Sequence, residues 1–195
     1  LVVGDFDGDR SLDIVVTLPA RGAVGVLVGN GAGELRLAGT VSLGFTPAGV
    51  LRAGDFNGDT KLDLVISGPG LGGASVALGD GKGGFSVPAA VGIGVQGITT
   101  ALGDFNRDGK LDLVTSGTLF SMTGPLRVLQ VMLGVGNGLF ETGSTLFPLL
   151  GTSESMLAVA DVDGDRKLDL IGVSSRDTRN QSVRIYLGDG AGGFG

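Results

Sequence analysis

The chain has no cysteine, no histidine and no tryptophan, and each absence narrows what it can be. Without cysteine there is no disulfide framework, and thiols give no clue to the redox compartment. Without histidine and cysteine the chain lacks the usual general base and the commonest thiol nucleophile, so we expect it not to be an enzyme. No stretch approaches eighteen consecutive apolar residues, so no membrane span is predicted. The net charge of −6, without a basic stripe, argues against nucleic-acid binding.

Glycine is the abundant residue, at 39 of 195, and 42% of the chain is hydrophobic. A glycine-rich chain of low hydrophobicity would indicate disorder, but this one combines glycine with many valines, leucines and isoleucines. That combination is typical of many short strands joined by tight turns. The composition therefore favours an all-β fold.

One nonapeptide pattern, D-x-[DN]-x-D-x-x-L-D, occurs four times, beginning at Asp5, Asp55, Asp104 and Asp161. Alternate residues of a tight loop point inward, so positions 1, 3, 5 and 9 can converge on one hard cation, and the backbone carbonyl of position 7 can add an oxygen. Calcium takes roughly six to eight oxygen ligands. We therefore predict up to four Ca²⁺ ions, one per loop. The candidate ligands are Asp5, Asp7, Asp9, Ser11 and Asp13; Asp55, Asn57, Asp59, Lys61 and Asp63; Asp104, Asn106, Asp108, Lys110 and Asp112; and Asp161, Asp163, Asp165, Lys167 and Asp169, with Ser11 and the three lysines acting through their carbonyls.

The four loops hold fourteen of the twenty acidic residues. Four bound calcium ions would change the net charge from −6 to +2, so the acidic balance is interpreted as metal-site charge rather than a surface for a basic partner. The other six acids are Glu34, Asp80, Glu141, Glu154, Asp177 and Asp189.

Two other interpretations of the loops fit the sequence less well. An EF-hand needs a glutamate at position 12, where this chain has Val16, Ile66, Thr115 and Gly172, and a helix after the loop, where this chain has strand-like runs. Metal-free turns would leave three or four carboxylates in nine residues repelling one another. Cytosolic free calcium is usually too low to fill weak sites, so a secreted or cell-surface location is expected.

The first aspartates are separated by 50, 49 and 57 residues, which indicates a repeat array, either a propeller or a solenoid. A glycine turn follows each loop, and the spacing from this turn to the next loop is nearly constant. Three of the four turns carry Asn-Gly or Asp-Gly, the strongest short hairpin signal. Four antiparallel strands in about fifty residues are typical of a propeller blade. The chain is predicted to be one propeller segment, 1–195, with repeats at about 1–48, 49–97, 98–155 and 156–195. The last repeat is expected to lack its outer strand, so that the chain forms an arc of a larger propeller.

Within each repeat, the second residue of the loop (Phe6, Phe56, Phe105, Val162) and the loop leucine are predicted to plug the core. The spacing from loop to glycine turn lengthens in repeats three and four, which places insertions at 117–125 and 174–181. In a blade these connections lie on the face opposite the calcium loops, and such loops often carry binding function. Candidate ligand-binding residues there are Leu119, Phe120, Met122, Arg176 and Arg179, although the three apolar ones could instead fold back onto the blade.

These markers, D-F-D-G-D-x-x-L-D-[IL]-V and L-G-[ND]-G-x-G-x-[FL], resemble the FG-GAP/VCBS repeat family, which also supplies the calcium-loop blades of integrin alpha subunits. The resemblance covers essentially the whole chain. It implies a β-propeller, commonly seven-bladed, with calcium in the first hairpin of certain blades, and it carries the calcium ligands over to the positions given above. Asn57 and Asn106 replace aspartate at position 3, which the pattern allows and which should weaken those two sites.

Family members are extracellular adhesion, lectin-like or accessory domains. The resemblance therefore implies a protein-interaction or adhesion module, with a carbohydrate-binding lectin or a non-catalytic accessory domain of a secreted enzyme as alternatives. Propeller lectins often use aromatic stacking, and nine phenylalanines with one tyrosine make that material scarce. The expected partners are a protein or glycan on the face opposite the loops, and further propeller sequence or another chain to complete the ring.

Overall fold

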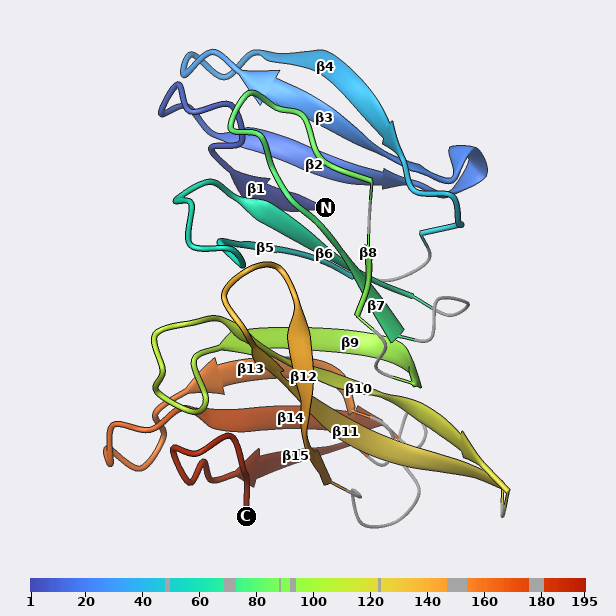
Figure 1. The fold of residues 1–195 in the computed structure, drawn as a ribbon, viewed down its shortest axis with the longest axis vertical. Helices are drawn as coiled ribbons and strands as arrows, with labels where there is room; N and C mark the ends of the chain where they lie inside the picture. The colour runs from blue at the N-terminus through green and yellow to red at the C-terminus, as the bar shows by residue number, and fades with distance from the viewer. Residues whose placement is uncertain are drawn as a thin grey trace.

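A computed structural model describes residues 1–47, 50–68, 73–87, 89–91, 94–122, 124–146, 154–175 and 181–195. Within these ranges the chain forms antiparallel sheets whose strands follow in sequence order (Figure 1). Blade 1 contains β1 (Val2–Gly4), β2 (Asp13–Leu18), β3 (Ala23–Gly29) and β4 (Leu35–Ser42), with the 3-10 turn η1 (Pro19–Arg21) between β2 and β3. Blade 2 contains β5 (Leu51–Gly54), β6 (Asp63–Gly68), β7 (Gly73–Ala77) and β8 (Ala89–Ala90). Blade 3 contains β9 (Val95–Gly103), β10 (Asp112–Ser121), β11 (Gly124–Gly134) and β12 (Phe140–Leu146). Blade 4 contains β13 (Glu154–Ala160), β14 (Asp169–Ser175) and β15 (Gln181–Tyr186).

The second and third strands of a blade are apolar on both faces because each inner blade lies between two others. In β10, Leu113 faces the core shared with blade 2, and Val114 faces the core shared with blade 4. Successive side chains of a strand point to opposite faces, so an unbroken apolar run is the pattern for a sheet covered on both sides. The described part of the chain is therefore an open arc of four propeller blades.

Three hydrophobic cores lie between successive blades. Phe6 belongs to the core between blades 1 and 2, Phe56 to the next, and Phe105 to the one between blades 3 and 4. All three rings are buried, which confirms the prediction that they plug the core. The inner strands β1, β5, β9 and β13 contact one another in turn.

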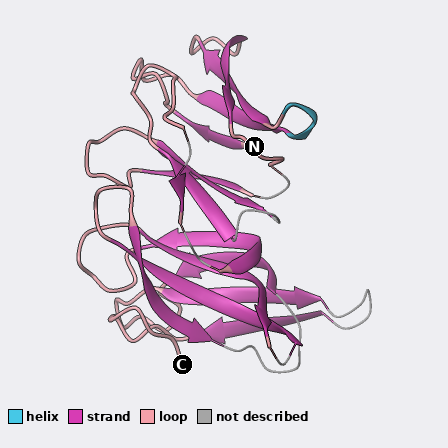
Figure 2. Ribbon diagram, turned by 45° about the vertical axis from the view of Figure 1, so that its right-hand side comes forward, coloured by secondary structure: helices cyan, strands magenta, loops and turns pink. Residues whose placement is uncertain are grey.

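The two edges of the arc differ in what they carry. In each blade the acidic loop joins the first strand to the second, and the glycine turn follows the third, so both lie at the same edge (Figure 2). The β2–β3 and β10–β11 connections lie at the opposite edge, as expected. No helix within the described residues has the length and hydropathy needed to cross a membrane.

Two details of the predicted strands and core are wrong. Repeat two is predicted to have a full fourth strand like the other complete repeats, but within the described residues that strand is reduced to β8 and to a single bridge between Gly79 and Phe85, and Val87 is exposed. The loop leucine of blade 1, Leu12, is 68% exposed, and Val162 of blade 4 is 46% exposed. Both side chains face away from the arc, where no neighbouring blade is present to cover them.

Candidate metal centre

Each acidic loop is a series of carboxylate-to-backbone hydrogen bonds. The position-1 aspartate accepts with both oxygens: Asp5 Oδ1 from the N–H of Gly8 at 2.7 Å, and Asp5 Oδ2 from the N–H of Arg10 at 2.9 Å. Positions 3 and 5 each accept from the N–H two residues later, as Asp7 does from Asp9 at 3.1 Å. The other three loops repeat these bonds with small variations. These side-chain turns curl the loop and aim its oxygens inward.

Positions 4 and 6 of every loop have positive φ, which explains why each copy carries a glycine at one of them. Gly8 precedes Arg10, with φ of 81° and 71°. In the third copy the order is reversed, with Arg107 at 62° and Gly109 at 83°. A left-handed residue other than glycine costs roughly 1–2 kcal/mol. The four loops therefore share the left-handed backbone at positions 4 and 6, whichever of the two positions holds the glycine.

The position-9 aspartate joins the loop to the glycine turn. Asp63, fully buried, accepts the N–H of Phe56 at 2.9 Å with one oxygen and that of Gly79 at 2.8 Å with the other. The same two bonds recur at Asp13, Asp112 and Asp169. Burial raises the pKa of Asp63 and of Asp112, and the accepted N–H bonds partly offset that effect. This tie between two hairpin connections was not foreseen from the sequence, which treated position 9 only as a metal ligand.

Two of the four loops bring three carboxylates together. Oxygens of Asp5, Asp7 and Asp13 lie within 4.8 Å of one another, and so do those of Asp161, Asp163 and Asp169. Desolvation raises the pKa of the Asp7 carboxyl, and the charges of its aspartate neighbours raise it further. An all-carboxylate set of this spacing fits a hard divalent cation such as calcium. Loops 2 and 3 have Asn57 and Asn106 at position 3, so a third carboxylate is missing from their sets.

The position-5 aspartates lie outside both three-carboxylate groups. Three of them instead face the lysine two residues later: Asp59 with Lys61 at 3.1 Å, Asp108 with Lys110 at 3.4 Å, and Asp165 with Lys167. The hydrogen bonds from Lys61 and Lys167 lower the pKa of Asp59 and Asp165 respectively. Position 5 as a calcium ligand stays a prediction, as do the carbonyls of Ser11, Lys61, Lys110 and Lys167.

The predicted ligand-binding residues differ in their surroundings. Leu119 packs against the core between blades 2 and 3, as the folding-back alternative required. Phe120 is 64% exposed, and Met122 is fully exposed at the tip of the β10–β11 hairpin. Arg176 and Arg179 lie outside the described residues.

A buried charged cluster in blade 4 escaped the sequence reasoning. Glu154 is fully buried, and its Oε1 accepts hydrogen bonds from Tyr186 Oη at 2.8 Å and Arg184 Nη1 at 3.2 Å. Burial and the bond to Glu154 raise the pKa of Tyr186 to about 12. Glu154 was counted among the acids outside the loops, and no local motif marks it. The pairing between β13, β14 and β15 alone creates the cluster.

The glycine turns provide a first testable prediction. Asp80 Oδ1 accepts the N–H groups of Lys82 and Gly84 at 2.7 and 2.9 Å, and Asn30 and Asp189 do the same in their turns. The third turn has the same backbone bond, from Val135 N to Leu139 O at 3.0 Å, but its valine cannot accept, and Asn137 Oδ1 accepts the N–H of Leu139 at 3.1 Å instead. An aspartate at position 135 would therefore gain the N–H of Asn137. Val135→Asp should therefore add about 1 kcal/mol of stability and raise Tm by roughly 2–4 °C. Leu139→Asp, an exposed control in the same turn, should give no gain; an unchanged Tm for Val135→Asp would contradict the prediction.

The fold and its loops together define an open β-propeller segment in which an acidic loop joins the first two strands of each blade. The FG-GAP-like repeat model matches residues 5–66 and 55–115. The chain therefore belongs to the FG-GAP-like repeat family. No curated protein matches it at a significant level.

Two solved structures share the fold. A lectin from Agrocybe aegerita, described for its specific recognition of non-reducing terminal N-acetylglucosamine, is 24% identical over 99% of this chain, with a TM-score of 0.65. The Tc holotoxin pore of Photorhabdus luminescens is 19% identical over 94% of this chain, with a TM-score of 0.54. The chain spans about half the length of the lectin (49%) and 9% of the toxin chain. At these identities the likeness concerns the fold.

Proposed function

We propose that the chain is a calcium-stabilised, extracellular β-propeller segment that binds a protein ligand through the edge opposite the acidic loops. The observation that carries the proposal is the β10–β11 hairpin. Its strands, of 10 and 11 residues, are the longest described, and its tip presents Phe120 and Met122 to solvent. Exposed apolar side chains gathered on a projecting element are typical of protein-interaction sites.

The hairpin is built to hold its tip in place. Phe120 pairs with Pro125 and Leu119 with Leu126 across the two strands. Below the tip, Leu119 packs into the core, and Arg127 Nη1 donates to Thr118 Oγ1. Because the base is anchored, little conformational entropy would be lost when the tip binds a partner.

Calcium is proposed as the ion of the acidic loops because the donors are hard oxygens and the convergent carboxylates repel one another without a cation. Loops 1 and 4 are the strongest candidates, since each brings three carboxylates within 4.8 Å. An extracellular or secreted location follows from the calcium concentration that such exposed sites need. The loop carboxylates accept backbone N–H bonds throughout, which supports a structural, non-catalytic role.

Carbohydrate binding is the second candidate, favoured by the likeness to the Agrocybe aegerita lectin. An accessory domain of a secreted enzyme would use the same surfaces. For any of these roles we propose that the arc is completed to a ring by further propeller sequence or by another chain, since blades 1 and 4 each leave one apolar face uncovered.

A parallel binding experiment separates the two candidates. Labelled, calcium-loaded protein is applied to a glycan array that includes terminal N-acetylglucosamine and to a panel of purified extracellular-matrix and cell-surface proteins. We expect protein binding that falls at least tenfold in the double variant Phe120→Ser with Met122→Ser, because truncation of exposed anchor residues removes most interface energy. Val87→Ser, which removes an exposed apolar side chain from blade 2, is the matched control. Sugar binding that a free monosaccharide competes away, with no effect of the hairpin variant, would favour the lectin instead.

A further inference from the structure

The three interfaces between successive blades share one contact, in which a leucine side chain packs against a glycine. In each, the loop leucine of the later blade lies against the last residue of the inner strand of the earlier blade, which is always glycine. A Cβ built on Gly4 would lie 2.5 Å from Cδ1 of Leu62. The equivalent distances are 2.6 Å from Gly54 to Leu111 and 2.9 Å from Gly103 to Leu168.

A ring pair and one backbone bond accompany this contact. The rings pair across each interface, with centroids 5.8 Å apart for Phe6 and Phe85, 5.8 Å for Phe56 and Phe140, and 5.3 Å for Phe105 and Phe194. In each case the carbonyl of the earlier phenylalanine accepts an N–H from the glycine turn of the later blade: from Gly83 at 3.0 Å, Gly138 at 2.8 Å and Gly192 at 3.1 Å. The earlier blade thus contributes a glycine and a ring, and the later blade a leucine, a second ring and an N–H.

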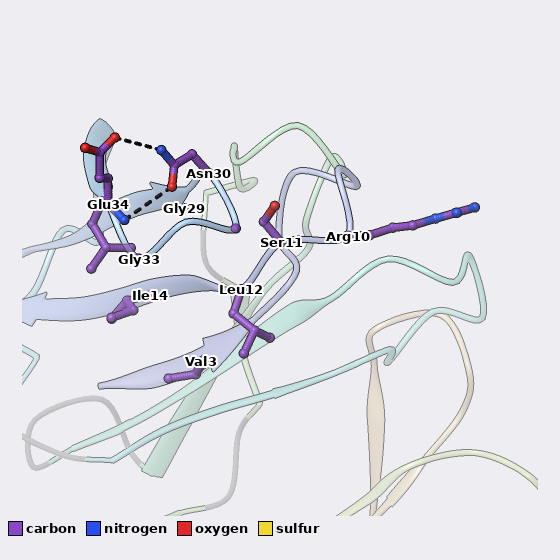
Figure 3. A pocket seen from close by; sticks show the side chains of 11 residues that line it. Val3, Arg10, Ser11, Leu12, Ile14, Gly29, Asn30, Gly33 and Glu34 are labelled. Carbon is purple, nitrogen blue, oxygen red and sulfur yellow. Dashed lines mark hydrogen bonds between the residues drawn. The ribbon is translucent and has the colours of Figure 1, made fainter.

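The outward face of blade 1 carries the residues that the later blade contributes at each of these interfaces. Leu12 is the exposed equivalent of Leu62, Leu35 stands where Phe85 stands, and Gly33 is the equivalent of Gly83. Leu12 and Leu35 border a pocket of about 460 Å³, whose lining includes Val3 and Ile14 (Figure 3). This pocket occupies the place where, between blades 1 and 2, blade 2 receives Phe6.

The outward face of blade 4 carries the positions that the earlier blade contributes at each of these interfaces, but with two of the residues changed. Ala160 replaces the glycine, and Val162 replaces the phenylalanine. The two changes are compatible, because a Cβ on Gly103 would lie 3.0 Å from the ring of Phe105, whereas one on Gly4 or Gly54 would lie 3.5 Å from the ring two residues later. A smaller side chain at that position relieves the tighter of these contacts, and Val162 is one. Ala160, Val162 and Leu35 are the departures from the repeat at these contact positions, and all three lie on the two open faces.

These two faces also carry most of the exposed large hydrophobic side chains in the described residues. Among the large hydrophobic side chains that are exposed, ten of sixteen lie on them: Leu1, Val3, Leu12, Leu35 and Leu37 on blade 1, and Met156, Val162, Val183, Ile185 and Leu187 on blade 4. Surfaces of this kind rarely stay uncovered in a soluble protein.

We propose that the outward face of blade 4 binds the outward face of blade 1 of a second copy of this chain, head to tail. Val162 enters the pocket beside Leu12 and Leu35, and its carbonyl accepts the N–H of Gly33, so an aliphatic pair replaces the aromatic pair of the other interfaces. The methyl of Ala160 requires only the flexible end of Leu12 to shift. The inference deepens the proposed ring completion and rests on it. Two copies would give eight blades, within the range known for propellers.

The interface is heterologous, which provides a specific test. Sedimentation velocity of the wild type at about 10–100 µM should show a dimer, and the variants Leu35→Asp and Val162→Asp should each weaken association at least about thirtyfold. A mixture of the two variants should associate more tightly than either variant alone, because one of its two contacts then joins the intact blade 4 face of Leu35→Asp to the intact blade 1 face of Val162→Asp, while the other contact carries both aspartates. Val87→Asp, exposed on blade 2, should associate like the wild type.

Larger species that both variants dissolve would also support the head-to-tail contact, since an interface that does not close makes filaments. A monomeric wild type over this range would overturn the proposal and favour further blades of the same polypeptide as the occupant. Association that survives both substitutions, or a mixture that associates no better than either variant alone, would overturn it as well. Calcium titration of the Leu35→Asp variant, whose substitution lies outside the four acidic loops, reports on the loops separately, so failure of the dimer and failure of the proposed calcium role are distinguishable.

Discussion

Replacing Asp112 by alanine should lower the free energy of unfolding by about 4 kcal/mol and Tm by roughly 10 °C, even in EDTA. Asp112 is fully buried and accepts three N–H groups: those of Phe105 at 2.8 Å, Asn106 at 3.3 Å and Gly134 at 2.8 Å. Alanine leaves these donors without a partner, and each unmatched buried donor costs about 1–3 kcal/mol. Urea unfolding with and without EDTA measures the change.

Two further variants separate the hydrogen-bonding role of Asp112 from its metal role. Asp112→Asn keeps one carbonyl acceptor but turns an NH₂ group towards a donor, so it should cost about half as much as alanine. Asp108→Ala, in the same loop, removes an exposed carboxylate and should cost less than about 1 kcal/mol in EDTA. If the Asp112→Ala variant were as stable as the wild type in EDTA, the carboxylate would act only through calcium, and the hydrogen-bonding account would be wrong.

The architecture of the loops could be predicted because it is local. Asp5, Asp7 and Asp9 fold their loop through bonds to N–H groups only two to five residues away, so a nine-residue pattern contains nearly all the information. The glycine turns are equally local. The strands between them follow from apolar runs of the right length, and their order follows from short connections.

What depended on neighbouring blades could not be predicted from the repeat. Leu12 and Leu62 occupy the same position in the pattern, yet Leu12 is exposed and Leu62 packs between blades, because a blade precedes only the second. The buried position of Glu154 arises from pairing of β13 with β14 and from residues thirty positions away. The short β8 shows the same limit, since 85–91 has strand-like residues but, among those that the structure describes, only Ala89–Ala90 pair as a strand with β7.

The loops also show that one carboxylate can serve two purposes. Sequence reasoning assigned position 9 to the metal because it completes the pattern, whereas the structure gives Asp13 bonds to Phe6, Asp7 and Gly29. Each carboxylate oxygen has two lone pairs, so these bonds leave room for a cation. The N–H bonds hold the carboxylate in place, and its negative charge then favours a cation beside Asp5 and Asp7.

Calcium removal should have the largest effect on the whole chain. A cation that binds only the folded state stabilises by about 2.7 kcal/mol per site at a hundredfold excess over Kd. Loops 1 and 4, each with three convergent carboxylates, should bind first, and Asn57 and Asn106 should make loops 2 and 3 weaker. Two filled sites alone correspond to about 5 kcal/mol, so EDTA should lower Tm by about 10 °C or more in differential scanning calorimetry.

The order in which the four loops bind calcium can be tested by exchanging aspartate and asparagine at position 3. Asn57→Asp should tighten loop 2, and Asp7→Asn should weaken loop 1, each by roughly tenfold in isothermal titration calorimetry, because each changes one charge at the same position. The calcium-dependent part of Tm should shrink as pH falls through the carboxylate range, since protons compete with the cation for the same oxygens. Identical melts in calcium and EDTA at neutral pH would refute calcium as the ion of these loops. If the four loops instead had the same calcium affinity, and neither substitution changed it, position 3 would not determine the order of binding. The affinity would then depend on the carboxylates at positions 1 and 9, which all four loops share.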